Sequence, residues 1–69
     1  MIEFELKNTE YIELIKLLKL LRFVESGGQA KLAVEDGLVK LNGQTEFRKR
    51  AKLRKGDKIR FENQLILIK

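Results

Sequence analysis

Hydrophobic and polar residues alternate along several short segments of the chain. Ile2, Phe4 and Leu6 alternate with charged neighbours, which is the two-residue period of a strand with one buried face. We expect an edge strand there. Further short strands are predicted where apolar residues alternate or cluster between turn residues, namely at Leu38–Leu41, Gln44–Phe47, Lys58–Phe61 and Leu65–Ile68.

A helical spacing occupies the segment that follows the first strand. Seven of the ten residues from position 12 to position 21 are apolar, and the three polar exceptions form one narrow stripe. This predicts a mostly buried helix over Tyr11–Leu21, with its Leu and Ile side chains in the core. Asn8 and Thr9 precede it and are residue types that cap helices.

A second, shorter helix is predicted from Gly27 or Gly28 to Glu35. Ser26 is a candidate N-cap, and Asp36-Gly37 is a helix stop because glycine adopts a positive φ without strain. Glycine lowers helix stability by about 1 kcal/mol relative to alanine in a helix interior. The paired glycines therefore either expose N–H groups that bind an anion or allow close packing against the first helix. The sequence leaves both interpretations open.

Turn residues separate the later strands. Asn42-Gly43 predicts a tight hairpin, and Lys55-Gly56-Asp57 predicts a turn in which glycine supplies a positive φ. A strand, two helices and then a run of short antiparallel strands predict an α+β fold. We expect a single domain, residues 1–69, in which two packed helices lie on a small, twisted, mostly antiparallel sheet.

Positive charge is concentrated in the second half of the chain. Residues 40–60 hold nine basic and two acidic residues, a net charge of +7, whereas the remainder carries a net charge of −2. A basic block is typical of a surface that binds a polyanion, although solvated lysine-rich surfaces are also common. The segment Arg48–Lys52 is too charged for the core, so we expect a loop or an exposed strand at the sheet edge.

Catalytic and metal chemistry is poorly supported. The chain has no Cys and no His, so it lacks the usual general base, thiolate ligands and disulfides. Its few hydroxyl side chains have no partner that would activate them. We expect no enzyme activity, no metal, no cofactor and no small-molecule substrate. No apolar run is long enough for a membrane span, and the first residues do not resemble a secretory signal, so we expect a cytoplasmic protein.

The aromatic residues bear on the kind of nucleic acid that would bind. Phe4, Tyr11, Phe23, Phe47 and Phe61 occupy positions in phase with the core, and we expect Phe47 to be buried although it adjoins the basic segment. An exposed stacking platform for single strands is therefore not predicted. Recognition of folded RNA by shape and phosphate contacts is favoured instead.

Several of these motifs occur in the order of a known family. Ser26, Gln29-Ala30, Gly37-Leu38-Val39-Lys40-Leu41-Asn42-Gly43 and Gly56-Asp57-Lys58-Ile59 resemble the S-four RNA-binding domain, named after a small-subunit ribosomal protein. The variant Ser26-Gly27-Gly28 is similar to the small stand-alone bacterial members of the YbcJ type. The resemblance implies two helices on a small twisted sheet and binding of structured RNA, often ribosomal RNA. Gly27 stands where the family usually has Arg, and Ile15 where many members have Asp.

The candidate RNA-binding residues combine the basic segment with the start of the second helix. Because Gly27 removes the phosphate contact that the family's Arg would make, Lys31 and the basic segment are the candidates to compensate for it. The alternative is a protein-interaction domain whose basic face docks on an acidic partner without contacting RNA. The oligomeric state is not determined by the sequence, and a monomer is the simpler expectation. The candidate residues are Lys19, Arg22, Gly27, Gly28, Lys31, Arg48, Lys49, Arg50 and Lys52.

Overall fold

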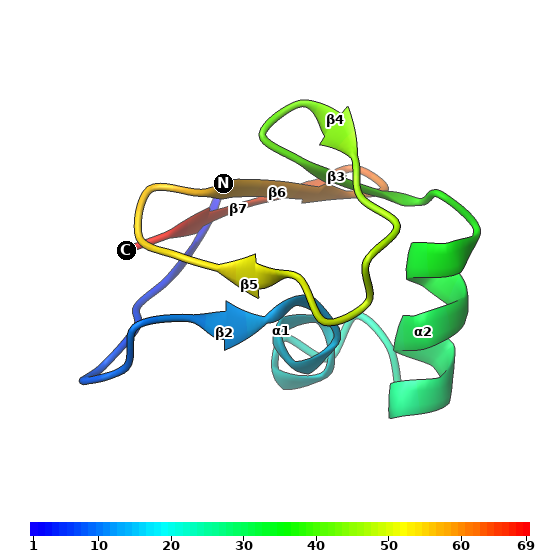
Figure 1. The fold of residues 1–69 in the computed structure, drawn as a ribbon, viewed down its shortest axis with the longest axis horizontal. Coiled ribbons are helices and arrows are strands. Elements are labelled where there is room, and N and C mark those ends of the chain that lie inside the picture. The colour runs from blue at the N-terminus through cyan, green and yellow to red at the C-terminus, as the bar shows by residue number, and fades with distance from the viewer.

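The computed structural model describes all 69 residues and consists of two layers (Figure 1). Helices α1 (Leu14–Leu20) and α2 (Gly27–Glu35) cover one face of a five-stranded sheet. A separate two-stranded ladder pairs β2 (Ile12–Glu13) with β5 (Lys52–Leu53). The predicted α+β architecture is confirmed. The sheet is built from β1 (Ile2–Phe4), β3 (Val39–Leu41), β4 (Gln44–Thr45), β6 (Lys58–Phe61) and β7 (Gln64–Ile68).

The sheet is mixed, with the strand order β1-β7-β6-β3-β4. All of its pairs are antiparallel except that of β1 with β7, in which Ile2 lies opposite Ile66 in a parallel register. The first strand is therefore an edge strand, as predicted. It pairs with β7, the last strand of the chain.

The core lies between the sheet and the helices. Fourteen buried apolar residues form one cluster, and in β6 the side chains alternate, with Ile59 and Phe61 inside and Lys58 and Arg60 outside. Phe23, in the connection between the helices, stacks on the Phe61 ring with centroids 5.9 Å apart. The small side chains of α2 face the core, since Ala30, Ala33 and Val34 are all buried.

The first helix is shorter than predicted, and its capping was predicted wrongly. It begins at Leu14 instead of Tyr11, because the preceding residues form β2, and Glu13 is its N-cap without a side-chain hydrogen bond. Its apolar surface is also less buried than expected, since Leu20 is 55% exposed. No helix is long and apolar enough to cross a membrane.

The turn predictions are largely correct. Asn42 and Gly43 have φ values of 51° and 88°, the pair of left-handed residues that a type I′ hairpin requires. Gly37 ends α2 with a φ of 77°. The strand predicted over Gln44–Phe47 ends at Thr45, so the chain leaves the sheet before Phe47.

Candidate nucleic-acid interface

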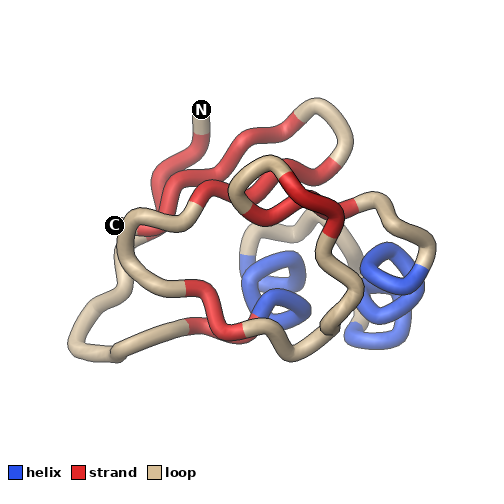
Figure 2. The backbone as a smooth tube through the Cα atoms, turned by 45° about the horizontal axis from the view of Figure 1, so that its top comes forward, coloured by secondary structure: helices blue, strands red, loops and turns tan.

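The basic segment lies in a loop whose carbonyl groups accept hydrogen bonds from the first N–H groups of α1. The N–H of Leu14 donates to the carbonyl of Ala51 at 2.9 Å, and the N–H of Ile15 donates to that of Lys49 at 3.1 Å. The first N–H groups of a helix have no partner within the helix, and here the loop supplies acceptors for two of them. Figure 2 shows this loop passing beside both helices before it enters β5. Its side chains are therefore held beside α1, and Ala51 is part of the core, contrary to the prediction for this segment.

We call the four basic residues of this segment the loop cluster: Arg48, Lys49, Arg50 and Lys52. Arg48, Arg50 and Lys52 are exposed, and Lys49 is half-buried. The cluster has four cations close together on a loop whose backbone is fixed at both ends by hydrogen bonds and strand pairing. A loop or an exposed strand was expected here, and both are present, because residues 48–51 form a loop and Lys52 begins β5.

Arg48 differs from the other members because it has an acidic partner. Its Nε and Nη2 donate to the two carboxylate oxygens of Glu46, each at 3.0 Å, and its backbone N–H donates to Oε2 at 2.9 Å. These hydrogen bonds lower the pKa of Glu46 below its ordinary value and raise the pKa of Arg48. The Arg48 side chain is 76% exposed, but its charge is already opposed within the chain.

Tyr11 lies against Lys52 of β5 and against Arg54, which follows β5, and it was not among the candidate residues expected from the sequence. Lys52 Nζ lies 5.0 Å from the Tyr11 ring centroid, and Arg54 Cζ lies 5.5 Å from it. The ring is 37% exposed and was wrongly expected in the core. Cation–π contacts at exposed sites contribute about 0.5–1 kcal/mol. They orient Lys52 and bring Arg54 to the loop cluster.

Phe47 was also expected in the core, and this prediction is wrong. Its side chain is 63% exposed, and its Cε1 lies 3.5 Å from where a Cβ on Gly37 would be. The ring rests on the glycine backbone at the end of α2. An aromatic ring is therefore exposed to solvent next to Arg48, where the sequence predicted no exposed aromatic residue.

The remaining candidate residues meet at the corner between the helices, and we call them the corner cluster: Lys19, Arg22, Gly27, Gly28 and Lys31. Lys19 Cδ lies 4.0 Å from where a Cβ on Gly27 would be. Lys19, Arg22 and Lys31 are all exposed. The end of α1 therefore places its cations beside the start of α2.

The start of α2 is well capped, but its glycines are not required by packing. Ser26 Oγ accepts from the N–H of Gln29 at 3.2 Å, and Gln29 Oε1 accepts from the N–H of Glu25 at 2.6 Å. Ser26 is thus the N-cap, as predicted. A Cβ at Gly27 or Gly28 would meet neighbours only at ordinary contact distances, 4.0 Å and 3.8 Å. Close packing against α1 therefore does not explain the two glycines.

Arg22 adopts a backbone conformation that favours glycine. The N–H of Arg22 donates to the Lys19 carbonyl at 3.0 Å and the N–H of Phe23 to the Leu18 carbonyl at 3.1 Å, which is a Schellman motif. The φ of Arg22 is 60°. In α2 the same position of the same motif is Gly37. An L-residue in this region costs about 1 kcal/mol or more, so arginine at this position lowers local stability relative to glycine.

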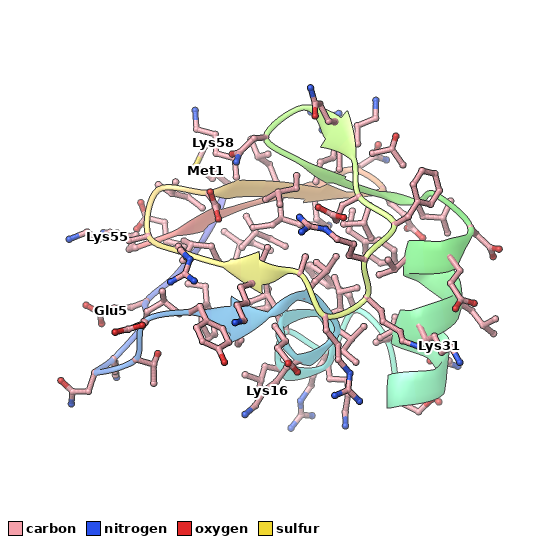
Figure 3. The ribbon with its side chains drawn as sticks, viewed as in Figure 1. Met1, Glu5, Lys16, Lys31, Lys55 and Lys58 are labelled. Atoms are coloured by element: carbon pink, nitrogen blue, oxygen red, sulfur yellow. The ribbon has the colours of Figure 1, made fainter.

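The two clusters lie at the two ends of α1, with the loop cluster beside its first residues and the corner cluster at its end. Seven residues rise about 10 Å along a helix, so the clusters are close neighbours. Figure 3 shows Lys31 and Lys16 on the helical side of the molecule, where α1 and α2 lie. Of the seven cations in the clusters, only Arg48 forms an ion pair within the chain. No three acidic side chains converge on a point where they would hold a metal ion.

The Asn-Gly and Gly-Asp motifs have a structural role that links two turns. Asn42 Nδ2 donates to Asp57 Oδ1 at 3.1 Å, and the N–H of Lys58 donates to Asn42 Oδ1 at 2.9 Å. Asp57 Oδ2 accepts from the N–H of Arg54 at 2.8 Å. These residues therefore hold the β3–β4 hairpin against the turn before β6.

Comparison with known proteins identifies the family. The family model described as "S4 domain" matches residues 4–69. The chain belongs to the S4 domain family. It is 40% identical over 68 residues, covering 99% of this chain and 97% of the relative, to a protein of Escherichia coli (strain K12) named "Putative RNA-binding protein YbcJ". The same figures hold for "Uncharacterized protein YbcJ" of Shigella flexneri.

A solved structure supports the S4 fold of this chain. The solution structure of Escherichia coli YbcJ superposes with a TM-score of 0.74 at 40% identity, covering 99% of this chain and 86% of that one. That structure is described as revealing an ALFAL motif involved in RNA-binding. The family resemblance and the predicted fold are therefore confirmed. Around α1 and the start of α2, the loop and corner clusters of this S4 domain hold six cations that have no acidic partner within the chain.

Proposed function

We propose that this S4 domain is a non-enzymatic RNA-binding module that holds structured RNA through phosphate contacts on its helical side. The observation that supports the proposal is the gathering of seven cations in the loop and corner clusters, six of which have no acidic partner within the chain. Each cation that reaches a phosphate releases condensed counterions, so even a few such contacts give useful affinity. Ribosomal RNA in the cytoplasm is the first candidate for this ligand.

The corner cluster contains residues that lower local stability, which is consistent with a binding role. Arg22 occupies a left-handed position that glycine would occupy at lower cost, and the two glycines of α2 stand where alanine would be tolerated. The glycines leave the backbone N–H groups at the start of α2 open to an approaching phosphate. Lys19 and Lys31 supply charge on either side of this helix start.

The loop cluster supplies three of the six cations that have no acidic partner within the chain. Arg50 and Lys52 are exposed and free of acidic partners, and Lys49 projects from a backbone that is bonded to α1. Arg48 contributes less because Glu46 accepts hydrogen bonds from two of its guanidinium nitrogens, Nε and Nη2. Neither phosphate contacts nor recognition of the shape of a folded RNA requires a protein to read base edges. The loop cluster therefore binds RNA without sequence readout.

The test is a competition and crosslinking experiment with the intact chain. A labelled RNA stem-loop is bound, then displaced by unlabelled stem-loop, by duplex DNA of equal length or by an acidic peptide. We expect the RNA to compete best and ultraviolet crosslinks to map to residues 47–54. Equal competition by the acidic peptide, with no crosslink to RNA, would contradict the proposal and favour a protein-binding role for the same basic surface.

A further inference from the structure

A second group of cations lies on the face of the sheet that no helix covers. Lys40 on β3 stands directly opposite Arg60 on β6, and Lys58 lies two residues from Arg60 along the same strand. Side chains at these three positions point to the same face, because alternate residues of a strand share a face. All three are exposed, and we call them the sheet patch.

The sheet patch has no acidic counterpart within the chain. The two ion pairs of the chain join Arg48 to Glu46 and Lys69 to Glu3, and neither involves the patch. Asp57 is next to Lys58 in sequence, but its oxygens accept from Asn42 and from the Arg54 N–H. Like charges directly opposite on neighbouring strands are destabilising, so the Lys40–Arg60 pair weakens the sheet unless an anion lies between them.

The patch also surrounds an open hollow that is large enough to admit a phosphate group. The hollow has a volume of about 530 Å³ and is lined by the three cations together with Asn42, Gly43, Gly56 and Leu65. It contains no carboxylate and one apolar side chain. A Cβ at Gly43 or Gly56 would meet no atom within 4 Å, so the two turns leave the rim of the hollow open.

The chain itself connects this patch to the helical side. Between β5 and β6, basic residues recur at Lys52, Arg54, Lys55 and Lys58. Figure 3 shows Lys55 at the end of the molecule and Lys58 near it on the sheet side. A track of positive charge therefore runs from the loop cluster, around the turn that precedes β6, to the sheet patch.

We propose that the sheet patch is a second phosphate-binding surface, which takes a further segment of the backbone of the RNA that the helical side holds. This inference rests on the RNA binding proposed above. The bound RNA then passes around the end of the molecule at residues 54–57. A folded RNA, which has phosphates on several sides, can contact both surfaces at once, whereas a short segment on one face cannot.

The experiment compares two double variants that remove the same charge. Lys40→Gln/Arg60→Gln alters the sheet patch, and Lys7→Gln/Lys69→Gln is the control on other exposed lysines. Binding of an RNA stem-loop is titrated at several salt concentrations. Each lost phosphate contact makes the negative slope of log K against log salt shallower by about 0.7–0.9, so we expect the slope of the sheet variant to be shallower by about 1.4–1.8. For the control, which retains the phosphate contacts, we expect the slope to become shallower by less than about 0.5.

Each outcome separates this inference from the general proposal. Equal slopes for the sheet variant and the control, with tight binding by the unmodified chain, overturn the second surface and leave RNA binding intact. Failure of the unmodified chain to bind RNA overturns both. If polyglutamate binds in its place and is lost in the sheet variant, the patch docks an acidic protein and the RNA assignment is wrong. Thermal unfolding checks the fold, and we expect the sheet variant to be at least as stable as the unmodified chain, since a repulsive pair is removed.

Discussion

Asn42 connects the two turns, and its removal gives the sharpest test of how they are held. Its backbone N–H donates to the Lys58 carbonyl at 2.7 Å, and its side-chain oxygen accepts from the Lys58 N–H at 2.9 Å. The side chain thus continues the β3–β6 ladder by one step where the chain turns away at Gly43. Its amide also donates to Asp57 at 3.1 Å.

Two substitutions separate the hydrogen bonds from the backbone strain. Asn42→Gly removes both side-chain bonds but tolerates the φ of 51°, whereas Asn42→Ala removes the bonds and also strains the backbone. Because Asn42 is exposed, we take each bond at about 0.5 kcal/mol, the lower end of the usual range. The free energy of unfolding should therefore fall by about 1 kcal/mol for glycine and by about 2 kcal/mol for alanine, since left-handed alanine costs about 1 kcal/mol more.

Thermal or denaturant unfolding measures both values. In a domain of this size, 1 kcal/mol corresponds to about 4–8 °C in Tm. Combining Asn42→Gly with Asp57→Ala should cost less than the sum of the single variants by about 0.5 kcal/mol, because both remove the same contact. Additive effects, with glycine as stable as asparagine, would refute the role given to this side chain.

Four further predictions concern the candidate interface. Glu46→Gln should strengthen RNA binding and steepen its salt dependence, because it frees Arg48; binding titration measures this. The pKa of Glu46 is lowered by that contact, so its stabilisation is present above about pH 4.5 and is lost as the pH falls through the folded pKa, which acid unfolding checks. Arg22→Gly should raise the free energy of unfolding by about 1 kcal/mol, as the motif at Gly37 indicates, while weakening RNA binding. Gly28→Ala should stabilise the fold by about 0.5–1 kcal/mol and weaken binding if phosphate approaches the helix start, whereas unchanged binding would exclude that approach.

Local sequence patterns predicted the elements whose causes are local. Ser26, Gly37 and the Asn42-Gly43 turn are determined by side chains and φ preferences within a few residues, and all three were predicted correctly. The alternation in β6 placed Ile59 and Phe61 in the core because a strand has a fixed period.

The errors arose where a distant segment determines the local structure. The first helix begins at Leu14 because the carbonyls of Lys49 and Ala51, far along the chain, accept its first N–H groups and because β2 pairs with β5. Tyr11 was thereby misplaced in the core, and its contacts with Lys52 and Arg54 were missed.

Phe47 shows a second source of error. An aromatic residue in a strand-like segment was expected to be buried, but the strand ends two residues earlier and the ring lies on Gly37. No pattern of polar and apolar residues reveals that a glycine backbone provides the contact surface. The candidate cations, by contrast, could be selected from charge alone, because a dense basic segment has few ways of being buried.

The central claim is that the helical side binds RNA through phosphate contacts, and its most direct test is the salt dependence of binding. The slope of log K against log salt is measured for the unmodified chain and for Lys49→Ala/Arg50→Ala/Lys52→Ala, with thermal unfolding to confirm that the variant is folded. If these three cations reach phosphates, the negative slope becomes shallower by about 2–3 in the variant, and its affinity drops most at low salt. An unchanged slope in a folded variant would contradict the account.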